Sequence, residues 1–115
     1  MKRPKKLSGA TYEFVTGCGS IYITCNDRDS KPYELIAIMG KGGGCAASQC
    51  EAIGRVISIA LQANAPIKDL IKQLSGISCH SPSGIGNEKV FSCADAIAKS
   101  LKTHSEEVSK TDVKP

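Results

Sequence analysis

The six cysteines of this 115-residue chain fall into two groups, and this division constrains the fold more than any other feature of the sequence. Four of them lie in turns flanked by Gly or Ser: Cys18, Cys45, Cys79 and Cys93. The other two, Cys25 and Cys50, lie within stretches of periodic apolar residues. A turn lets a thiolate leave the core and face a shared centre, whereas an apolar stretch buries its thiol. The sequence therefore predicts one metal site and two core thiols.

The first part of the chain predicts a three-stranded antiparallel meander. Three stretches rich in Tyr, Ile, Val and Thr are separated by turn residues, at 11–15, 20–25 and 33–39. The polar segment from Asn26 to Pro32 is expected to be a hairpin loop between the second and third strands. A chain of this length forms one domain with a modest core, which a bound metal would help to stabilise.

Helices are expected in the second part of the chain. Apolar residues recur at helical spacing over 45–62, and Pro66 is well placed as the first residue of a second helix that ends at Leu74, before Gly76. The run from Ser92 to Asp95 has the form of an N-cap with an acid three residues later, which opens a third helix. The predicted fold class is thus α+β, with a basic flexible arm at 1–7, a zinc-binding domain at 8–103 and a disordered polar tail at 104–115.

The expected topology brings the four turn cysteines to one end of the sheet. In an antiparallel meander, the turn after the first strand lies at the same end as the end of the third strand, so Cys18 and Cys45 are neighbours. The first of the two helices that follow leaves this end of the sheet and the second comes back toward it, so Cys79 is expected at the same end. Cys93, at the start of the third helix, completes the set. Four thiolates suit a closed, tetrahedral, structural zinc site with Zn–S distances of about 2.3 Å.

Other interpretations of the cysteines stay open at this stage. The paired Cys-x-x-Cys motif of many zinc sites is absent, and all six cysteines could instead be small core residues. Four cysteines can also hold iron or an iron–sulfur cluster. Thiols near helix starts could serve as a redox sensor. His80, next to Cys79, is an alternative metal ligand or a solvent-facing loop residue.

The net charge of +4 comes from the N-terminus rather than from the body of the chain. Lys2, Arg3, Lys5 and Lys6 supply it, while residues 7–98 hold seven Lys or Arg and eight Asp or Glu. Such an arm can contact nucleic acid or another acidic surface. The chain has no apolar run of membrane-spanning length and no signal-like apolar stretch near Met1, so we expect a cytoplasmic protein without membrane contact.

The glycine run from Gly40 to Gly44 separates the third strand from the first helix, a position that can attract phosphate. It matches neither the P-loop nor the dinucleotide-binding pattern, and its simpler role is to let the backbone turn so that Cys45 approaches a metal. Contact with a nucleotide or nucleic acid through Lys41 and Arg55 remains an alternative. No conventional catalytic group of residues is visible, so we expect no catalysis by the chain on its own.

Several motifs, in order, resemble the TSCPD domain: Thr16-Gly17-Cys18-Gly19, Gly42-Gly43-Gly44-Cys45-Ala46, Leu74-Ser75-Gly76-Ile77-Ser78-Cys79 and Ser92-Cys93-Ala94-Asp95. The resemblance covers about residues 8 to 103. This domain is the C-terminal module of many adenosylcobalamin-dependent ribonucleotide reductases and also occurs as small free-standing proteins. The resemblance implies Cys18, Cys45, Cys79 and Cys93 as the matching cysteines. The signature proline is replaced here by Ala94, and His80 stands where proline usually follows the third cysteine.

A reductase of that kind needs a large barrel for its cofactor and its radical-bearing cysteine, and 115 residues cannot contain one. The resemblance therefore implies a non-catalytic zinc-binding module related to ribonucleotide reduction, which acts through protein or nucleic-acid contacts. The alternative is an accessory or C-terminal component of an adenosylcobalamin-dependent ribonucleoside-diphosphate reductase, with the large reductase subunit as its partner. Self-association into an oligomer is compatible with either role.

Overall fold

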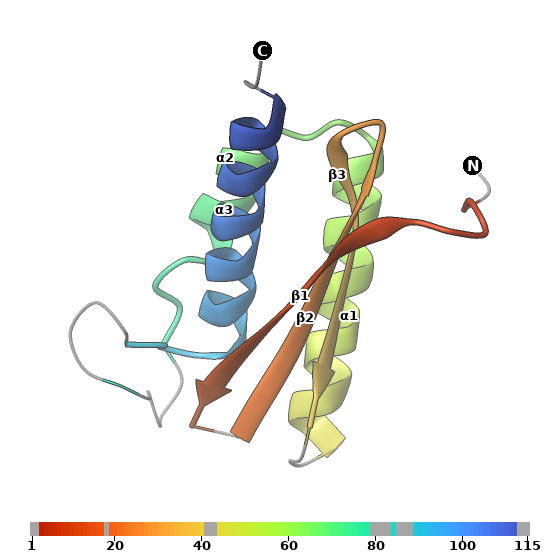
Figure 1. Ribbon diagram of the computed structural model, residues 1–115. Coiled ribbons are helices and arrows are strands. Elements are labelled where there is room, and N and C mark those ends of the chain that lie inside the picture. The colour runs from red at the N-terminus through yellow and green to blue at the C-terminus, as the bar shows by residue number, and fades with distance from the viewer. Residues whose placement is uncertain (1–2, 18, 41–43, 79–83, 85–88, 113–115) are drawn as a thin grey trace.

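The computed structural model has a three-stranded antiparallel sheet followed by three helices, which confirms the predicted α+β class (Figure 1). It describes residues 3–17, 19–40, 44–78, 84 and 89–112. The strands are β1 (Ser8–Thr16), β2 (Gly19–Arg28) and β3 (Lys31–Met39), in the order β1-β2-β3. The helices are α1 (Gly44–Gln62), α2 (Ile67–Leu74) and α3 (Cys93–Asp112).

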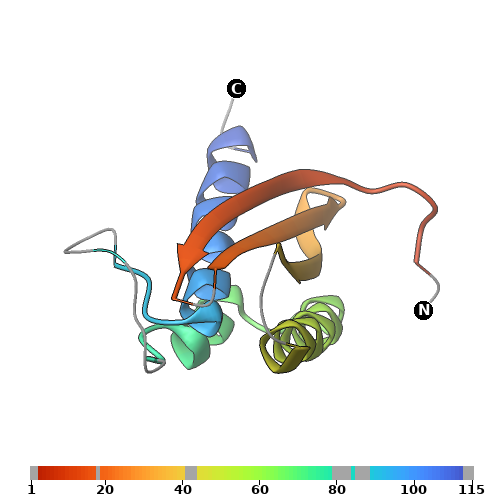
Figure 2. The ribbon, with the colours of Figure 1, turned by 90° about the horizontal axis from the view of Figure 1, so that it is seen from below.

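The sheet buries one face and leaves the other exposed. Alternate residues of β2 and β3 point to opposite sides, so Ile21, Ile23 and Leu35 are at most 2% exposed. On the other face, Tyr22 pairs with Ile38, and both side chains are exposed. The helices lie on one side of the sheet, and the predominantly apolar buried face packs toward them (Figure 2).

The hairpin between β2 and β3 is tighter than the sequence predicted. The expected loop at Asn26 to Pro32 is wrong, because Arg28 pairs with Lys31 and only Asp29 and Ser30 lie between the strands. Both of these residues have positive φ angles, of 54° and 64°. This backbone matches the right-handed twist of the two strands, and Asp tolerates it better than most residues. The pairing register shifts between Asn26 and Asp27, because β3 has one extra residue there, Tyr33, between the partners Pro32 and Glu34.

Helix α1 packs closely along β3, one of the two edge strands of the sheet. Gly54 makes this approach possible, since a Cβ atom there would lie 3.0 Å from the carbonyl oxygen of Leu35. Ser58 then bonds the same edge residue twice: the Leu35 N–H donates to Ser58 Oγ at 2.9 Å, and Ser58 Oγ is 3.1 Å from the Leu35 carbonyl oxygen. The helix thereby covers part of the strand edge that would otherwise face solvent.

Helix α2 packs against α3, and α3 packs against the sheet. Ile97 and Leu101 of α3 are fully buried, as the sequence predicted. The prediction of a disordered tail from residue 104 needs correction, because α3 continues to Asp112 and His104 is only 4% exposed. The polar composition of this segment reflects a helix with one buried face rather than a chain that lacks structure.

Candidate metal centre

A cavity of about 220 Å³ lies at the end of the sheet where β1 and β3 finish. Four separate segments of the chain supply its lining: Thr16; Ala46, Gln49, Cys50 and Ile53; Ile77 and Ser78; Ser92, Cys93 and Ala94. Each of these segments contains one of the four turn cysteines or lies within two residues of one in the sequence. The expected convergence of these segments at one end of the sheet is therefore present among the described residues.

Cys93 is the first residue of α3 and is partly buried at this cavity. Its Sγ atom lies 3.9 Å from the hydroxyl of Thr16, at the end of β1. It also lies 3.8 Å from the sulfur of Met39, at the end of β3. Both distances are near the upper limit for a hydrogen bond to sulfur, so these bonds are weak. The contacts show that the start of α3 lies next to the ends of β1 and β3.

Cys45 is the second residue of α1 and is exposed to solvent. The first turn of α1 has no acidic residue, so the partial positive charge of the helix N-terminus is not offset locally. The next residue, Ala46, lines the cavity. Cys45 is thus accessible to solvent at the start of α1.

Cys18, Cys79 and His80 lie outside the described residues. Within the described part of the chain, no group of three or more His, Cys, Asp or Glu side chains forms a metal site. Because Cys18 and Cys79 are not among the described residues, the four-cysteine site stays a prediction. Whether His80 joins it also stays open.

The other two cysteines lie in the core, as predicted. Cys25 of β2 and Cys50 of α1 are each 1% exposed and belong to the cluster of buried apolar residues. Burial, followed by the negative charge of Asp27, raises the pKa of the Cys25 thiol to about 12. Cys25 is therefore held as a neutral thiol and is a poor nucleophile at physiological pH.

The start of α3 is capped by two buried polar side chains, Ser92 and Asp95. The Asp95 backbone N–H donates to Ser92 Oγ at 3.1 Å, which confirms Ser92 as the N-cap. The Asp95 carboxylate accepts from the Phe91 N–H at 3.1 Å and from the Gly76 N–H at 2.8 Å. The Ser92 hydroxyl donates to the Ile77 carbonyl oxygen. The capping pair therefore also joins α3 to the segment that follows α2.

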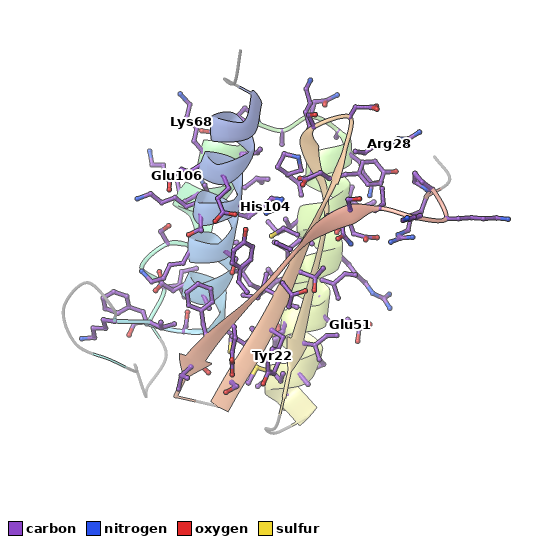
Figure 3. The ribbon with its side chains drawn as sticks, in the orientation of Figure 1. Tyr22, Arg28, Glu51, Lys68, His104 and Glu106 are labelled. Atoms are coloured by element: carbon purple, nitrogen blue, oxygen red, sulfur yellow. The ribbon has the colours of Figure 1, made fainter. Side chains whose placement is uncertain are left out.

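Sequence reasoning missed a hydrogen-bond network on the sheet side of α3, centred on His104 (Figure 3). His104 Nδ1 lies 2.9 Å from the Tyr12 hydroxyl, and the two rings meet edge to face. The Tyr12 hydroxyl lies 3.0 Å from Glu107, to which it donates. Burial and the Glu107 contact raise the pKa of Tyr12 above its usual range. A signal existed: His104 continues the helical spacing of the buried Ile97 and Leu101.

The basic residues do not gather at this cavity in the part of the chain that the structure describes. Arg3 binds Glu34 through two bonds, of 2.6 and 3.0 Å, so the N-terminal segment contacts the sheet at this point. Arg55 pairs with Glu51 one helical turn away. Lys5 and Lys6 are exposed, whereas Lys2 and Lys41 lie outside the described residues. Nucleic-acid contact stays a prediction.

Among the described helices, none is both long enough and apolar enough to cross a membrane.

The family model of the TSCPD domain matches residues 1–105 of the chain. Neither a curated protein nor a solved structure matches it. The family match covers both the sheet and the helices, and includes all four turn cysteines together with His104.

Proposed function

The chain belongs to the TSCPD domain family, which is linked to ribonucleotide reductases, and from this we propose that it is a non-catalytic zinc-binding module related to ribonucleotide reduction. Cys18, Cys45, Cys79 and Cys93 would hold the zinc ion. In this role the metal supplies a cross-link between segments that are distant in the sequence. It performs no chemistry on a substrate, because four thiolates leave no open position for a reacting water.

The cavity at the end of the sheet is the observation that carries this proposal. Cys93 itself lines the cavity, as do Ala46, the residue after Cys45, and Ser78, the residue before Cys79. Thr16, which also lines it, is two residues before Cys18. Each of the four cysteines is thus a cavity-lining residue or lies within two residues, in sequence, of one, and this proximity in the sequence supports the proposal. Four thiolates together would be a donor set that fits tetrahedral zinc.

The surroundings of the cysteines distinguish two of the four proposed ligands from the core thiols. Cys45 and Cys93 lie in the first turns of α1 and α3, where Cys45 is exposed and Cys93 is partly buried. By contrast, the core environment of Cys25 favours the neutral thiol. The chain therefore separates its cysteines into potential ligands and packing residues by their surroundings, as a structural metal site requires.

Metal analysis of the purified protein tests this proposal. The protein is prepared without added metal, and its elemental content and visible spectrum are recorded for the wild type and for single Cys→Ala variants. We expect about one zinc per chain, no colour, and loss of zinc in each of Cys18→Ala, Cys45→Ala, Cys79→Ala and Cys93→Ala. The matched controls, Cys25→Ala and Cys50→Ala, should keep their zinc.

Other results would replace the proposal with a different one. Stoichiometric iron with colour would indicate an iron–sulfur or iron centre and a role in electron transfer. An absence of metal would contradict the zinc site and favour a thiol redox sensor, for which the exposed Cys45 is the accessible group.

We further propose that the module acts through protein contacts. Four large apolar side chains are exposed on the open face of the sheet: Val15, Tyr22, Ile36 and Ile38. Copurification with a large reductase subunit that is lost in Ile38→Lys would support this role. Salt-sensitive binding to DNA or RNA that is lost when Lys2, Arg3, Lys5 and Lys6 become alanine would instead favour a nucleic-acid-binding module.

A further inference from the structure

We propose that Ser92 and Asp95 are positioning residues, which hold the segment leading into Cys79 beside the helix start that carries Cys93. The expected effect on zinc release rests on the proposed zinc function. The contacts themselves do not depend on a metal. Both side chains are buried, with 7% and 2% exposure. Each makes one bond within its own helix start and another to a segment more than a dozen residues away.

The Ser92 hydroxyl has two bonding partners. It accepts a hydrogen bond from the Asp95 backbone N–H, which is the usual N-cap interaction. It donates its own hydrogen to the carbonyl oxygen of Ile77, 15 residues earlier in the chain. The first bond stabilises α3, whereas the second fixes the residue two positions before Cys79. An N-cap alone would need only the first.

The Asp95 carboxylate divides its oxygens in the same way. Oδ2 accepts from the Phe91 N–H within the start of α3 and lies 3.6 Å from the Lys99 ammonium one turn later. Oδ1 accepts from the Gly76 N–H at 2.8 Å, across 19 residues. Hydrogen bonds to a buried carboxylate are stronger than those between neutral groups, because one partner is charged.

Gly76 has the backbone conformation that makes this second bond possible. Its φ angle is +77°, in the left-handed region that non-glycine residues avoid, and it follows Ser75, the C-cap of α2. The chain turns here, and the next residues, Ile77 and Ser78, line the cavity together with Ser92 and Cys93. Asp95 and Ser92 thus bind Gly76 and Ile77, which precede Cys79 by three and two residues.

The rate of zinc release measures how far Ser92 and Asp95 stabilise the proposed metal site. Removing residues that orient metal ligands typically lowers metal affinity about 10- to 100-fold. If this loss falls on dissociation, chelator-driven release of zinc from Asp95→Ala should be faster than from the wild type by about the same factor. Asp95→Asn keeps the shape and one acceptor oxygen, so it should fall between the two. Ser92→Ala should also speed release, and Ser92→Thr, which keeps the hydroxyl, should restore the wild-type rate.

A destabilised control separates positioning from general loss of stability. His104→Ala loosens the same helix at a site away from the cavity, at the contacts with Tyr12 and Asp27. It should lower the free energy of unfolding but leave the zinc release rate of the folded protein near that of the wild type. Equal release rates in the Asp95→Asn and His104→Ala variants would overturn the inference.

Metal-free protein distinguishes a failure of this inference from a failure of the zinc proposal. Amide exchange at Gly76 should be about 10- to 100-fold faster in Asp95→Ala than in the wild type, because the N–H loses a charged acceptor. In a Cys18→Ser, Cys45→Ser background with oxidised glutathione added as the oxidant, a disulfide between Cys79 and Cys93, formed with release of two reduced glutathione molecules, should form more slowly after Asp95→Ala. A wild type without zinc that shows both effects would refute only the zinc proposal. Unchanged exchange and disulfide formation would overturn the positioning role, whatever the metal content.

Discussion

His104 of α3 and Asp27 of β2 are 77 residues apart in the sequence, yet the Nε2 atom of the histidine lies 2.9 Å from both carboxylate oxygens of the aspartate. On its other side, the same ring meets the Tyr12 hydroxyl of β1. One buried side chain therefore connects the last helix to two strands of the sheet. The helix that begins at Cys93 is held to the sheet partly through this ring.

Replacing this histidine should destabilise the fold. In His104→Ala, Asp27 and Tyr12 each lose a hydrogen-bond partner and a cavity is left in a buried position, so the free energy of unfolding should fall by about 2–3 kcal/mol. Chemical denaturation measures the loss. Thr103→Ala, an exposed neighbour on the same helix, should change it by less than about 0.5 kcal/mol. A His104→Ala variant as stable as the wild type would show that the network contributes little.

The close approach of α1 to β3 predicts opposite effects at two glycines of the same helix. Gly54→Ala places a Cβ atom 3.0 Å from the backbone oxygen of Leu35, which cannot move without disturbing the strand. The resulting overpacking, about 1–3 kcal/mol, should exceed the gain of up to about 1 kcal/mol in helix propensity. Gly44→Ala meets nothing within 4 Å and should be neutral or stabilising. Thermal unfolding of both variants tests the contrast, and a stabilised Gly54→Ala would contradict it.

The Arg3–Glu34 ion pair should make stability depend on pH in the acidic range. The hydrogen bond from Arg3, with a further one from Asn26, holds the pKa of Glu34 below its ordinary value. A lowered pKa in the folded state means that the pair's contribution is present above the ordinary Glu pKa of about 4.3 and is lost as the pH falls through the folded-state value. Urea unfolding of the wild type and Glu34→Gln, between pH 7 and pH 3, should give curves that converge at low pH. Parallel curves would contradict this account.

Thiol reactivity should follow the separation of the cysteines. In metal-free folded protein at pH 8, a thiol reagent should modify Cys45 on the order of a thousandfold faster than Cys25. This difference reflects the raised pKa of Cys25, about 12, which leaves very little thiolate, and burial adds to it. Mass spectrometry of the labelled peptides reports the order of modification. Equal rates in the native state would mean that the core opens readily, and unfolding in denaturant should abolish the difference.

The parts of the fold that local pattern controls could be predicted from the sequence. Alternation of Ile21, Ile23 and Cys25 indicated the buried face of β2, and helical spacing placed Cys50 and Ile57 toward the core. The tight turn was missed because it uses Asp29 and Ser30 at positive φ, without the glycine that usually marks such a turn. His104 was missed because its partners, Tyr12 and Asp27, are distant in the sequence and its own segment is polar.

For the candidate site, the sequence predicted which segments meet, and the four-cysteine metal site stays a prediction. Meander topology was enough to expect that the turn cysteines belong at one end of the sheet, and the lining of the cavity agrees for the described segments. The contacts of Ser92 with Ile77 and of Asp95 with Gly76 were beyond sequence reasoning. They depend on the path between α2 and α3, which no local pattern specifies.

X-ray absorption at the zinc edge tests the central claim most directly, because it reports the atoms bound to the metal. The account predicts four sulfur neighbours at about 2.3 Å and no nitrogen or oxygen neighbour. A nitrogen neighbour at about 2.0 Å, lost in His80→Ala, would contradict the four-cysteine site and make His80 a ligand. Protein without bound zinc would contradict the zinc-binding function itself.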